Sequence, residues 1–397
     1  MPKRIPSEWG SVRMVETPDQ LDQALKEWRQ AEILGVDTEA NSFFAYHDRL
    51  CLMQVSTARH DYVVDPIPLG EALREVNSLL ADPDVVKIFH AAEYDLMLLN
   101  KDLGAEVRGL FDTQVAMTFL EKGKTGLAAL IEKHYGFSLS KKEQRSNWGK
   151  RPLTEEQVAY ARIDTHFLPD LYDRLLPELK QRGLFEAARG EFQRLEREIL
   201  SPRQPDMEAW RRFKGARQLS PEAAARLRAL FQWREKLASR EDLPPFRILA
   251  NPTLMELAER PPKEMAELAK RKGVGWRKAR TVGQDILQAL RAVAGQKTHD
   301  HVGRRISSAE RKVKKVKREN QEALRRWRKQ MADNLELPPE RLMHRRHLEA
   351  IGEKLPRDRE TLLRLVHLTD WQRENLEPSL LELLAQLPDP GKLPPAN

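Results

Sequence analysis

Two carboxylates one residue apart follow a short apolar segment. The stretch from Ile33 to Val36 is typical of a buried strand, and Asp37 and Glu39 come directly after it. Because successive strand side chains point to opposite faces, these two acids would point to the same side. They would repel each other unless one took up a proton or a cation neutralised them. A divalent ion such as Mg²⁺ would satisfy them, and an ordinary polar strand face is the other interpretation.

Further acids stand at the ends of later elements. In "KIFHAAEYDLMLLN", His90 ends an expected strand and Asp95 begins the next helix. In "YARIDTHFLPDLYDRL", Tyr160 and Asp164 are four residues apart and would share one helical face. Taken singly, each of these could be a half-buried aromatic or a surface charge.

The elements that must position these residues lie in the first half of the chain. Strands are expected at 33–38, 50–56, 61–64, 85–89 and 107–112, and helices at 21–31, 69–80, 94–103, from 113, 127–135 and 154–182. This order predicts a mixed central sheet flanked by helices. Thr154 and Gln157 form a capping-box pattern that would begin the last of these helices.

An internal repeat occupies the second half. The residues Trp233, Arg234, Ala238, Leu243-Pro244-Pro245, Arg247 and Leu254 recur 94 positions later as Trp327, Arg328, Ala332, Leu337-Pro338-Pro339, Arg341 and Leu348. We interpret this as two copies of one all-helical domain. The tryptophans would anchor the cores, and the proline pairs would end helices.

The charged residues are distributed unequally between the two halves of the chain. Of 397 residues, 1–200 contain 26 Lys/Arg and 33 Asp/Glu, whereas 201–397 contain 42 and 27. A basic half suggests a polyanionic partner. No apolar run approaches the roughly 20 residues that span a membrane, and no signal peptide is expected at the N-terminus. The one cysteine, Cys51, fits a buried core residue in a reducing cytoplasm.

In combination these motifs resemble a known family. The acids with Tyr160, together with "FDTQVAMTFL" and "SKKEQRSNWGKRPLTEEQVAYARID", are similar to ribonuclease D in the DEDDy group of 3′→5′ exonucleases. The repeats resemble its HRDC (helicase and ribonuclease D C-terminal) domains. The resemblance implies a ribonuclease H-like exonuclease domain at 1–205, HRDC domains at 206–298 and 321–390, a basic linker at 299–320 and a disordered tail at 391–397.

The resemblance also implies roles for individual residues. Asp37, Glu39, Asp95 and Asp164 would hold two divalent ions, Mg or Mn, with Asp37 bridging them. Tyr160 would orient the attacking water. The family usually has Phe directly after the Asp-Thr-Glu triplet, but this chain has Ala40-Asn41-Ser42 before Phe43 and Phe44, as in exosome-associated relatives.

Four residues are candidates for contacts with the substrate: Phe43, Phe44, His90 and Lys141. The two phenylalanines could stack on terminal bases or pack into the sheet. For His90, a hydrogen bond that positions its loop is favoured over metal ligation, since hard cations prefer oxygen.

The leading hypothesis is a monomeric, cytoplasmic 3′→5′ exoribonuclease that releases nucleoside 5′-monophosphates from RNA. Precursors of tRNA are the substrates that the family implies. The alternatives are the same chemistry on DNA, which recognition of the 2′-OH would exclude, and a non-catalytic protein that binds RNA through its repeats.

Overall fold

The computed structural model describes residues 11–121, 123–136, 138–139, 142–199, 206–298 and 307–392. The chain forms two compact units. The first contains Met1–Ala40, Leu50–Pro202 and Ile306–Asn397, and the second contains Asn41–Arg49 and Arg203–Arg305. The expected tail beyond 392, part of the expected linker (299–306) and Lys141 lie outside the described residues.

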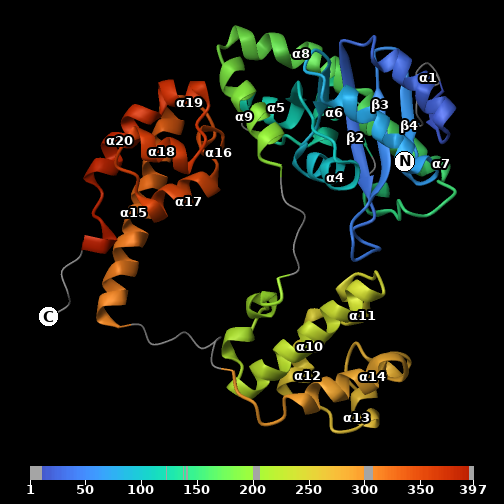
Figure 1. Cartoon of the computed structure of the whole chain (residues 1–397), viewed down its shortest axis with the longest axis vertical. Helices are drawn as coiled ribbons and strands as arrows, with labels where there is room; N and C mark the ends of the chain where they lie inside the picture. The colour runs from blue at the N-terminus through green and yellow to red at the C-terminus, as the bar shows by residue number, and fades with distance from the viewer. Residues whose placement is uncertain are drawn as a thin grey trace. The chain divides into compact units, whose positions relative to one another are not determined.

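A six-stranded mixed sheet forms the centre of the first unit (Figure 1). Its order is β1-β4-β3-β2-β5-β6. Strand β2 is antiparallel to β3 and parallel to β5, β3 is antiparallel to β4, and the pairs β1–β4 and β5–β6 are parallel. The strands are β1 (Arg13–Val15), β2 (Ile33–Ala40), β3 (Leu50–Ser56), β4 (Asp61–Val64), β5 (Val86–Phe89) and β6 (Leu110–Asp112). The expected mixed sheet is confirmed, and the sequence analysis missed only the three-residue strand β1.

Helices cover this sheet. They are α1 (Pro18–Trp28), α2 (Pro66–Leu69), α3 (Val76–Leu80), α4 (Glu93–Leu103), α5 (Thr113–Leu120), α6 (Leu127–Tyr135), α7 (Glu155–His166), α8 (Leu168–Gln181) and α9 (Phe185–Arg197). Helices α7 and α8 contact β2, and α4 contacts β2 and β3. The sheet and these helices enclose a large apolar core that includes Leu34, Val36 and Ile88, and a smaller one that includes Cys51 and Leu52.

Two of the expected helices are interrupted. The helix expected at 154–182 breaks into α7 and α8 at Phe167, just before Pro169, because a proline lacks the amide hydrogen that would continue the ladder. The segment expected at 69–80 contains a 3₁₀ turn at Gly70–Glu75. The capping box of Thr154 and Gln157 is present, with both reciprocal hydrogen bonds.

The second half of the chain is helical, as expected. The first repeat consists of α10 (Pro221–Arg240), α11 (Pro245–Ile248), α12 (Asn251–Glu259), α13 (Met265–Ala269) and α14 (Gly275–Ala292). The second repeat consists of α15 (Ser308–Asn334), α16 (Pro339–Leu342), α17 (Arg345–Lys354), α18 (Arg359–Leu365), α19 (Asp370–Asn375) and α20 (Glu377–Gln386). Within the expected linker, residues 308–320 are the first part of α15.

The 94-residue offset extends beyond the matching letters. Helix α11 maps onto α16 with both ends in register, and α12 and α17 begin 94 residues apart. The single helix α14 corresponds to α19 and α20, which are separated at Leu376 just before Pro378. The expectation that the proline pairs end helices is wrong, because Pro245 and Pro339 begin α11 and α16, where the missing amide hydrogen costs nothing.

The second repeat packs against helix α9 of the same unit. A Cβ on Gly190 would lie only 2.8 Å from the Thr369 side chain, so glycine permits a close approach between α9 and α19. His347 lies 3.0 Å from Glu198, and Arg341 lies 3.8 Å from Glu191. Trp327 is a core residue of this repeat, and its Nε1 donates to Ser379. Trp233 of the first repeat is only partly buried.

None of the helices described here has a stretch that is both long and apolar enough to span a bilayer. Cys51 is buried, as expected.

Candidate active site

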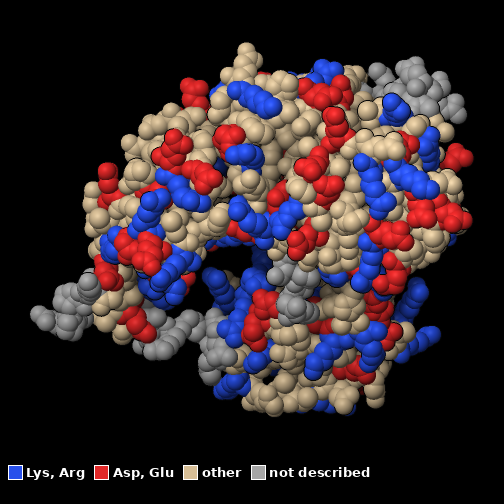
Figure 2. Space-filling view, turned by 45° about the horizontal axis from the view of Figure 1, so that its top comes forward, with Lys and Arg blue, Asp and Glu red and all other residues tan. Residues whose placement is uncertain are grey.

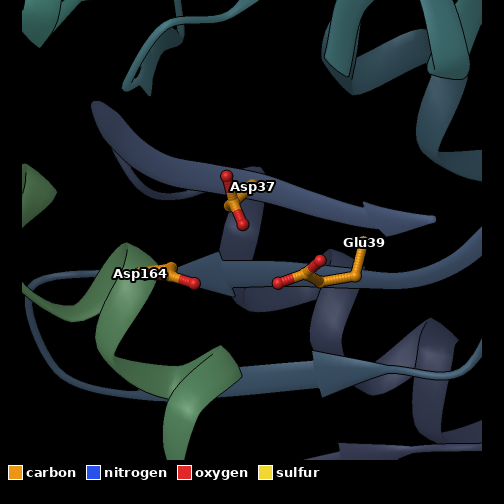
Figure 3. Close-up of side chains that lie close together, drawn as sticks. All are labelled: Asp37, Glu39 and Asp164. Carbon is orange, nitrogen blue, oxygen red and sulfur yellow. The ribbon is translucent and has the colours of Figure 1, made fainter. Parts of the chain in front are cut away.

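Three carboxylates converge where strand β2 and helix α7 lie next to each other. Asp37 and Glu39 extend from β2 and Asp164 from α7, and their carboxylate groups point toward one another (Figure 3). One oxygen from each lies within 4.8 Å of the other two. This spacing suits the shared coordination of a small divalent cation by oxygen ligands.

Close packing between β2 and α7 creates this convergence. Gly35 lies on the same face of β2 as Asp37 and Glu39, because positions 35, 37 and 39 alternate along the strand. A Cβ at Gly35 would lie 2.9 Å from the carbonyl oxygen of Thr165 and 3.0 Å from Leu168. A larger residue would push α7 and α8 away from the strand, and Asp164 would move with them.

A buried polar network also fixes α7. Arg162 donates to Asp61 over 2.6 Å, and His166 Nδ1 lies 2.9 Å from the same carboxylate. Ser56 Oγ lies 2.8 Å from both Asp61 and Thr165. Burial opposes the charged form of Asp61, but the hydrogen bonds outweigh it and lower the pKa of this group. The network ties α7 to β3 and β4 on either side of Asp164.

Four negative charges on Asp37, Glu39, Asp95 and Asp164 at the same time are strongly disfavoured. Burial, followed by repulsion from the other acids, raises the pKa of Asp37 well above its ordinary value and that of Glu39 to about 9. Burial raises the pKa of Asp95 and of Asp164 to about 7. In the described part of the chain no Lys, Arg or His forms an ion pair with any of the four. The donor set therefore fits a divalent cation, which would neutralise the pocket.

Asp95 stands beside the cluster of three and is held differently. Its Oδ1 accepts a hydrogen bond from the Thr38 amide over 3.1 Å and another from the Thr38 hydroxyl. The Thr38 side chain points to the other face of β2 from Asp37 and Glu39. Asp95 nevertheless lies near enough to raise the pKa values of Asp37 and Glu39. The Thr38 contact was not foreseen, although Thr between the two acids was visible in the sequence.

The turn that leads into the helix of Asp95 is organised by Asp112. Its carboxylate accepts from the amides of Ala91 and Ala92 at 3.1 and 2.8 Å, and it also caps α5. Ala91 adopts a positive φ of 63°, a strained conformation that these hydrogen bonds stabilise. Sequence reasoning missed Asp112, although its position at the start of a helix is typical of a capping aspartate.

His90 belongs to the same turn. Its Nδ1 lies 2.9 Å from the Thr113 hydroxyl, which itself donates to the Phe89 carbonyl over 3.0 Å. Burial lowers the pKa of His90 to about 4, so the ring is neutral at pH 7. Because the hydroxyl proton of Thr113 is already used, Nδ1 carries the ring proton and donates it. This contact positions the loop.

Tyr160 hydrogen-bonds to Asp164, one turn further along α7. Its ring centroid lies 6.0 Å from that of buried Trp148. Burial, followed by the charges of Asp164, Glu39 and Asp37, raises the pKa of Tyr160 above its ordinary value. The phenol therefore stays protonated at neutral pH and is a hydrogen-bond donor.

The loop between β2 and β3 belongs to the second unit. The amides of Tyr46 and His47 donate to Asp242 over 3.1 and 3.0 Å. The centroid of the Phe44 ring lies 4.7 Å from the guanidinium carbon of Arg247. Phe43 is 47% exposed.

Comparisons with known proteins agree with this architecture. Residues 12–180 match the family model described as 3'-5' exonuclease, and residues 223–290 and 319–384 match the HRDC domain. The chain is 32% identical over 283 residues to ribonuclease D of Gluconacetobacter diazotrophicus, an alignment that covers 70% of this chain and 71% of that protein.

Relatives from the exosome are also similar. The exosome complex exonuclease RRP6 of Saccharomyces cerevisiae is 34% identical over 265 residues, which is 63% of this chain and 36% of that protein. This chain thus spans only about a third of the length of the first curated relatives that it matches. The crystal structure of the catalytic core of RRP6 from Trypanosoma brucei superposes with a TM-score of 0.66 at 26% identity, covering 74% of this chain and 86% of that one.

Proposed function

This chain belongs to the ribonuclease D family, and we propose from this premise that it is a hydrolytic 3′→5′ exoribonuclease that releases nucleoside 5′-monophosphates. The resemblance to ribonuclease D with HRDC domains is thereby confirmed. The observation that supports the activity best is the convergence of Asp37, Glu39 and Asp164 within 4.8 Å inside the exonuclease domain. A non-catalytic protein that only binds RNA, the alternative considered above, would have no need to keep such an unfavourable cluster intact.

We assign the cation-binding role to the acids. Asp37, Glu39 and Asp164 would hold divalent ions, and we propose two, Mg²⁺ or Mn²⁺, with Asp95 as the fourth acid of the site. When bound, such ions supply an activated water and stabilise charge on the attacking and leaving oxygens of a phosphodiester. Thr38 fixes the orientation of Asp95 through two hydrogen bonds.

Tyr160 would orient the attacking water. Its raised pKa makes it a poor general base at neutral pH. Its O–H is held near the acids by the hydrogen bond to Asp164. The phenol has a single proton, which it donates to Asp164 in this structure. Once a cation holds that carboxylate, the phenol would turn this donor to the water or the terminal phosphate, while the proton of the water leaves by another route.

The natural substrate and setting are finer proposals. We propose structured RNAs such as tRNA precursors as substrates, with the basic repeats holding the RNA body. The buried single cysteine fits a reducing cytoplasm, and we propose that the chain acts there as a monomer.

The test uses an RNA labelled at its 5′ end with a free 3′ hydroxyl. The full chain with Mg²⁺ should shorten it stepwise from the 3′ end and release nucleoside 5′-monophosphates, which chromatography identifies. EDTA should stop the reaction and added Mg²⁺ should restore it. A matched DNA oligonucleotide in the same tube measures the preference for ribose. A failure to shorten the RNA with Mg²⁺ or Mn²⁺ would refute the proposal, and faster cleavage of the DNA would favour the deoxyribonuclease alternative.

A further inference from the structure

Net charge alone does not locate a surface that grips RNA. On the face shown in Figure 2, Lys and Arg side chains are interspersed with Asp and Glu over most of the surface. One stretch of the first repeat departs from this mixture. Residues 268–284 contain six Lys or Arg residues and no Asp or Glu. We call residues 270–280, which contain all six, the basic turn.

The basic turn has a defined backbone. It runs from the end of α13 into the first turns of α14, which begins at Gly275. Gly273 and Gly275 adopt positive φ angles of 83° and 66°, which favour glycine. The Thr253 hydroxyl of α12 donates to the Lys272 carbonyl over 3.2 Å. Val274 is buried in the core of the repeat. These contacts with the repeat hold the basic turn in one conformation, so a binding partner would not lose affinity by ordering it.

The outward side of the turn combines cations with an aromatic ring. Trp276 is 55% exposed, and Lys270, Lys272, Arg277 and Arg280 are exposed around it in sequence. None of these four forms an ion pair with any described carboxylate, whereas Arg271 lies 3.7 Å from Glu256. An exposed tryptophan among uncompensated cations is unfavourable for a surface that meets only water.

The second repeat uses the equivalent turn differently. The positions 94 residues after Lys272, Trp276 and Arg280 are Val366, Asp370 and Glu374. Val366 and Leu368 are buried, and Thr369 packs against Gly190 of α9. The same structural element is thus an internal contact in one copy and a basic, aromatic surface in the other. The architecture of the repeat does not demand the cations or the exposed ring.

We infer that the basic turn of the first repeat binds single-stranded RNA, with the cations on the phosphodiester backbone and Trp276 stacked on an unpaired base. This inference rests on the proposed function and adds to it a site remote in sequence from the catalytic acids. Backbone neutralisation by Lys and Arg supplies affinity that depends on salt. Stacking of a base on an aromatic ring supplies affinity that tolerates any sequence. RNA offers both chemistries together, whereas an acidic peptide offers only the first.

The experiment separates these two contributions in the full chain. One variant carries Lys270→Gln, Lys272→Gln and Arg277→Gln, and the others carry Trp276→Ala or Trp276→Phe. The matched control, Lys26→Gln, Arg29→Gln and Arg59→Gln, removes three exposed cations from the exonuclease domain. Fluorescence anisotropy measures Kd for a hairpin RNA with a single-stranded 3′ tail, over a range of salt and in EDTA so that the RNA persists.

We expect the charge variant to reduce the slope of log K against log salt by about 2, or about 0.7 for each lost contact to a single strand. Trp276→Ala should weaken binding by about 5- to 150-fold without changing the slope, and Trp276→Phe should restore most of the affinity. The control triple should bind like the wild type. If both variants of the turn bind RNA as the wild type does, the inference is overturned and the surface is left to a protein partner. A loss with the charge variant alone would overturn the stacking role of Trp276.

Hydrolysis of a saturating trinucleotide distinguishes this failure from a failure of the proposed function. The short RNA is consumed at the acidic site, and the variants should turn it over at the wild-type rate. A wild-type chain that hydrolyses no RNA would refute the exoribonuclease itself. If the chain is active but its affinity for RNA is unchanged by the substitutions in the basic turn, only the RNA-binding role of the turn is refuted.

Discussion

Two clusters of acidic side chains in the first unit differ in whether cations of the protein neutralise them. The acidic pocket (Asp37, Glu39, Asp95 and Asp164) has no ion-pair partner among the described cations. The α9 interface contains the acids Glu191 and Glu198, which pair with Arg194, Arg341 and Arg346, and neutral His347 lies beside Glu198. Both clusters contain buried and half-buried acids, yet only the second balances their charge within the protein.

The difference separates a structural cluster from a functional one. A buried charge that serves stability alone must be paired, because its desolvation is otherwise uncompensated. The α9 interface follows this rule and joins the second repeat to the exonuclease domain. The acidic pocket breaks it, and the raised pKa values of its four acids are the consequence. Such a pocket is stabilised when a cation arrives from solution, which is what catalysis would require.

The largest expected effect comes from removing one charge from the acidic pocket. Asp164→Asn should reduce the rate of nucleotide release by about 10²–10³-fold or more, the range for losing one preorganised electrostatic group. Because the substitution also relieves repulsion, the metal-free protein should be at least as stable as the wild type. Rates with 3′-end-labelled RNA and thermal melts in EDTA measure the two properties. Full activity would show that the unpaired acids are not catalytic.

The opposite result is expected for Glu191→Gln at the α9 interface. Glu191 is buried, and its carboxylate lies 3.0 Å from the Arg194 guanidinium. Breaking a buried pair by removing one partner costs about 3–5 kcal/mol, and we expect the lower end of this range because Arg194 also lies 3.3 Å from Glu198. Urea denaturation should show this loss in the free energy of unfolding, while turnover of a trinucleotide stays unchanged at a temperature where the variant is folded. A stable variant would mean that these charges do not hold the interface together.

A smaller effect is expected for Tyr160→Phe, which keeps the ring and removes the donor. The rate should fall by about 10–100-fold, as for loss of an oriented group beside a metal site. The Mg²⁺ concentration for half-maximal rate should hardly change, since the four acids remain. A pH–rate profile is the discriminating measurement. If Tyr160 acted as the general base, the variant would lose the limb of the profile that reports it, whereas an orienting donor lowers the rate equally at all pH values.

The sequence predicted the sheet and the acids better than the surroundings that hold them. Period-2 and period-3.6 patterns located five strands and most helices, and the Asp-x-Glu spacing placed Asp37 and Glu39 on one face of β2. The convergence of Asp164 with them was expected only through the family resemblance. It depends on Gly35, whose missing Cβ lets α7 approach, and no local pattern reports a contact between residues 35 and 165.

Other features could not be foreseen for related reasons. Pro169 indicates a break in the expected helix, but not the residue at which the break falls, since a proline is tolerated anywhere in the first turn of the helix that follows. The pairing of α9 with the second repeat joins Glu191 and Arg341, which are far apart in the chain. Phe44 contacts Arg247 of the first repeat, whereas the sequence offered only base stacking or burial in the sheet.

The pH dependence of stability should sharpen the contrast between the two clusters. Folding raises the pKa of Glu39 to about 9 and of Asp95 and Asp164 to about 7, while free carboxyls titrate near 4. Between these limits the folded state binds more protons than the unfolded state, so stability falls as the pH rises from about 4 through 9. In EDTA the melting temperature should drop by a few degrees between pH 6 and 9.

Added Mg²⁺ should reverse most of that drop, because the cation replaces the protons as the neutralising charge. Asp164→Asn should show a shallower dependence on pH, and this variant is the matched control. A melting temperature that is flat with pH in both proteins would mean that the four acids do not share one desolvated pocket.

The smallest effect is expected for Glu198→Gln, at the exposed rim of the α9 interface. Glu198 lies 3.0 Å from His347 and 3.3 Å from Arg194, and it also pairs with Arg346. The Arg346 side chain is 37% exposed, so water can replace much of what the substitution removes. The free energy of unfolding should decrease by about 0.2–1 kcal/mol, the range for solvent-accessible pairs, and the decrease should shrink in high salt. A loss of unfolding free energy as large as that of Glu191→Gln would mean that Glu198 is as desolvated as Glu191, and that each acid of the α9 interface contributes equally to its stability.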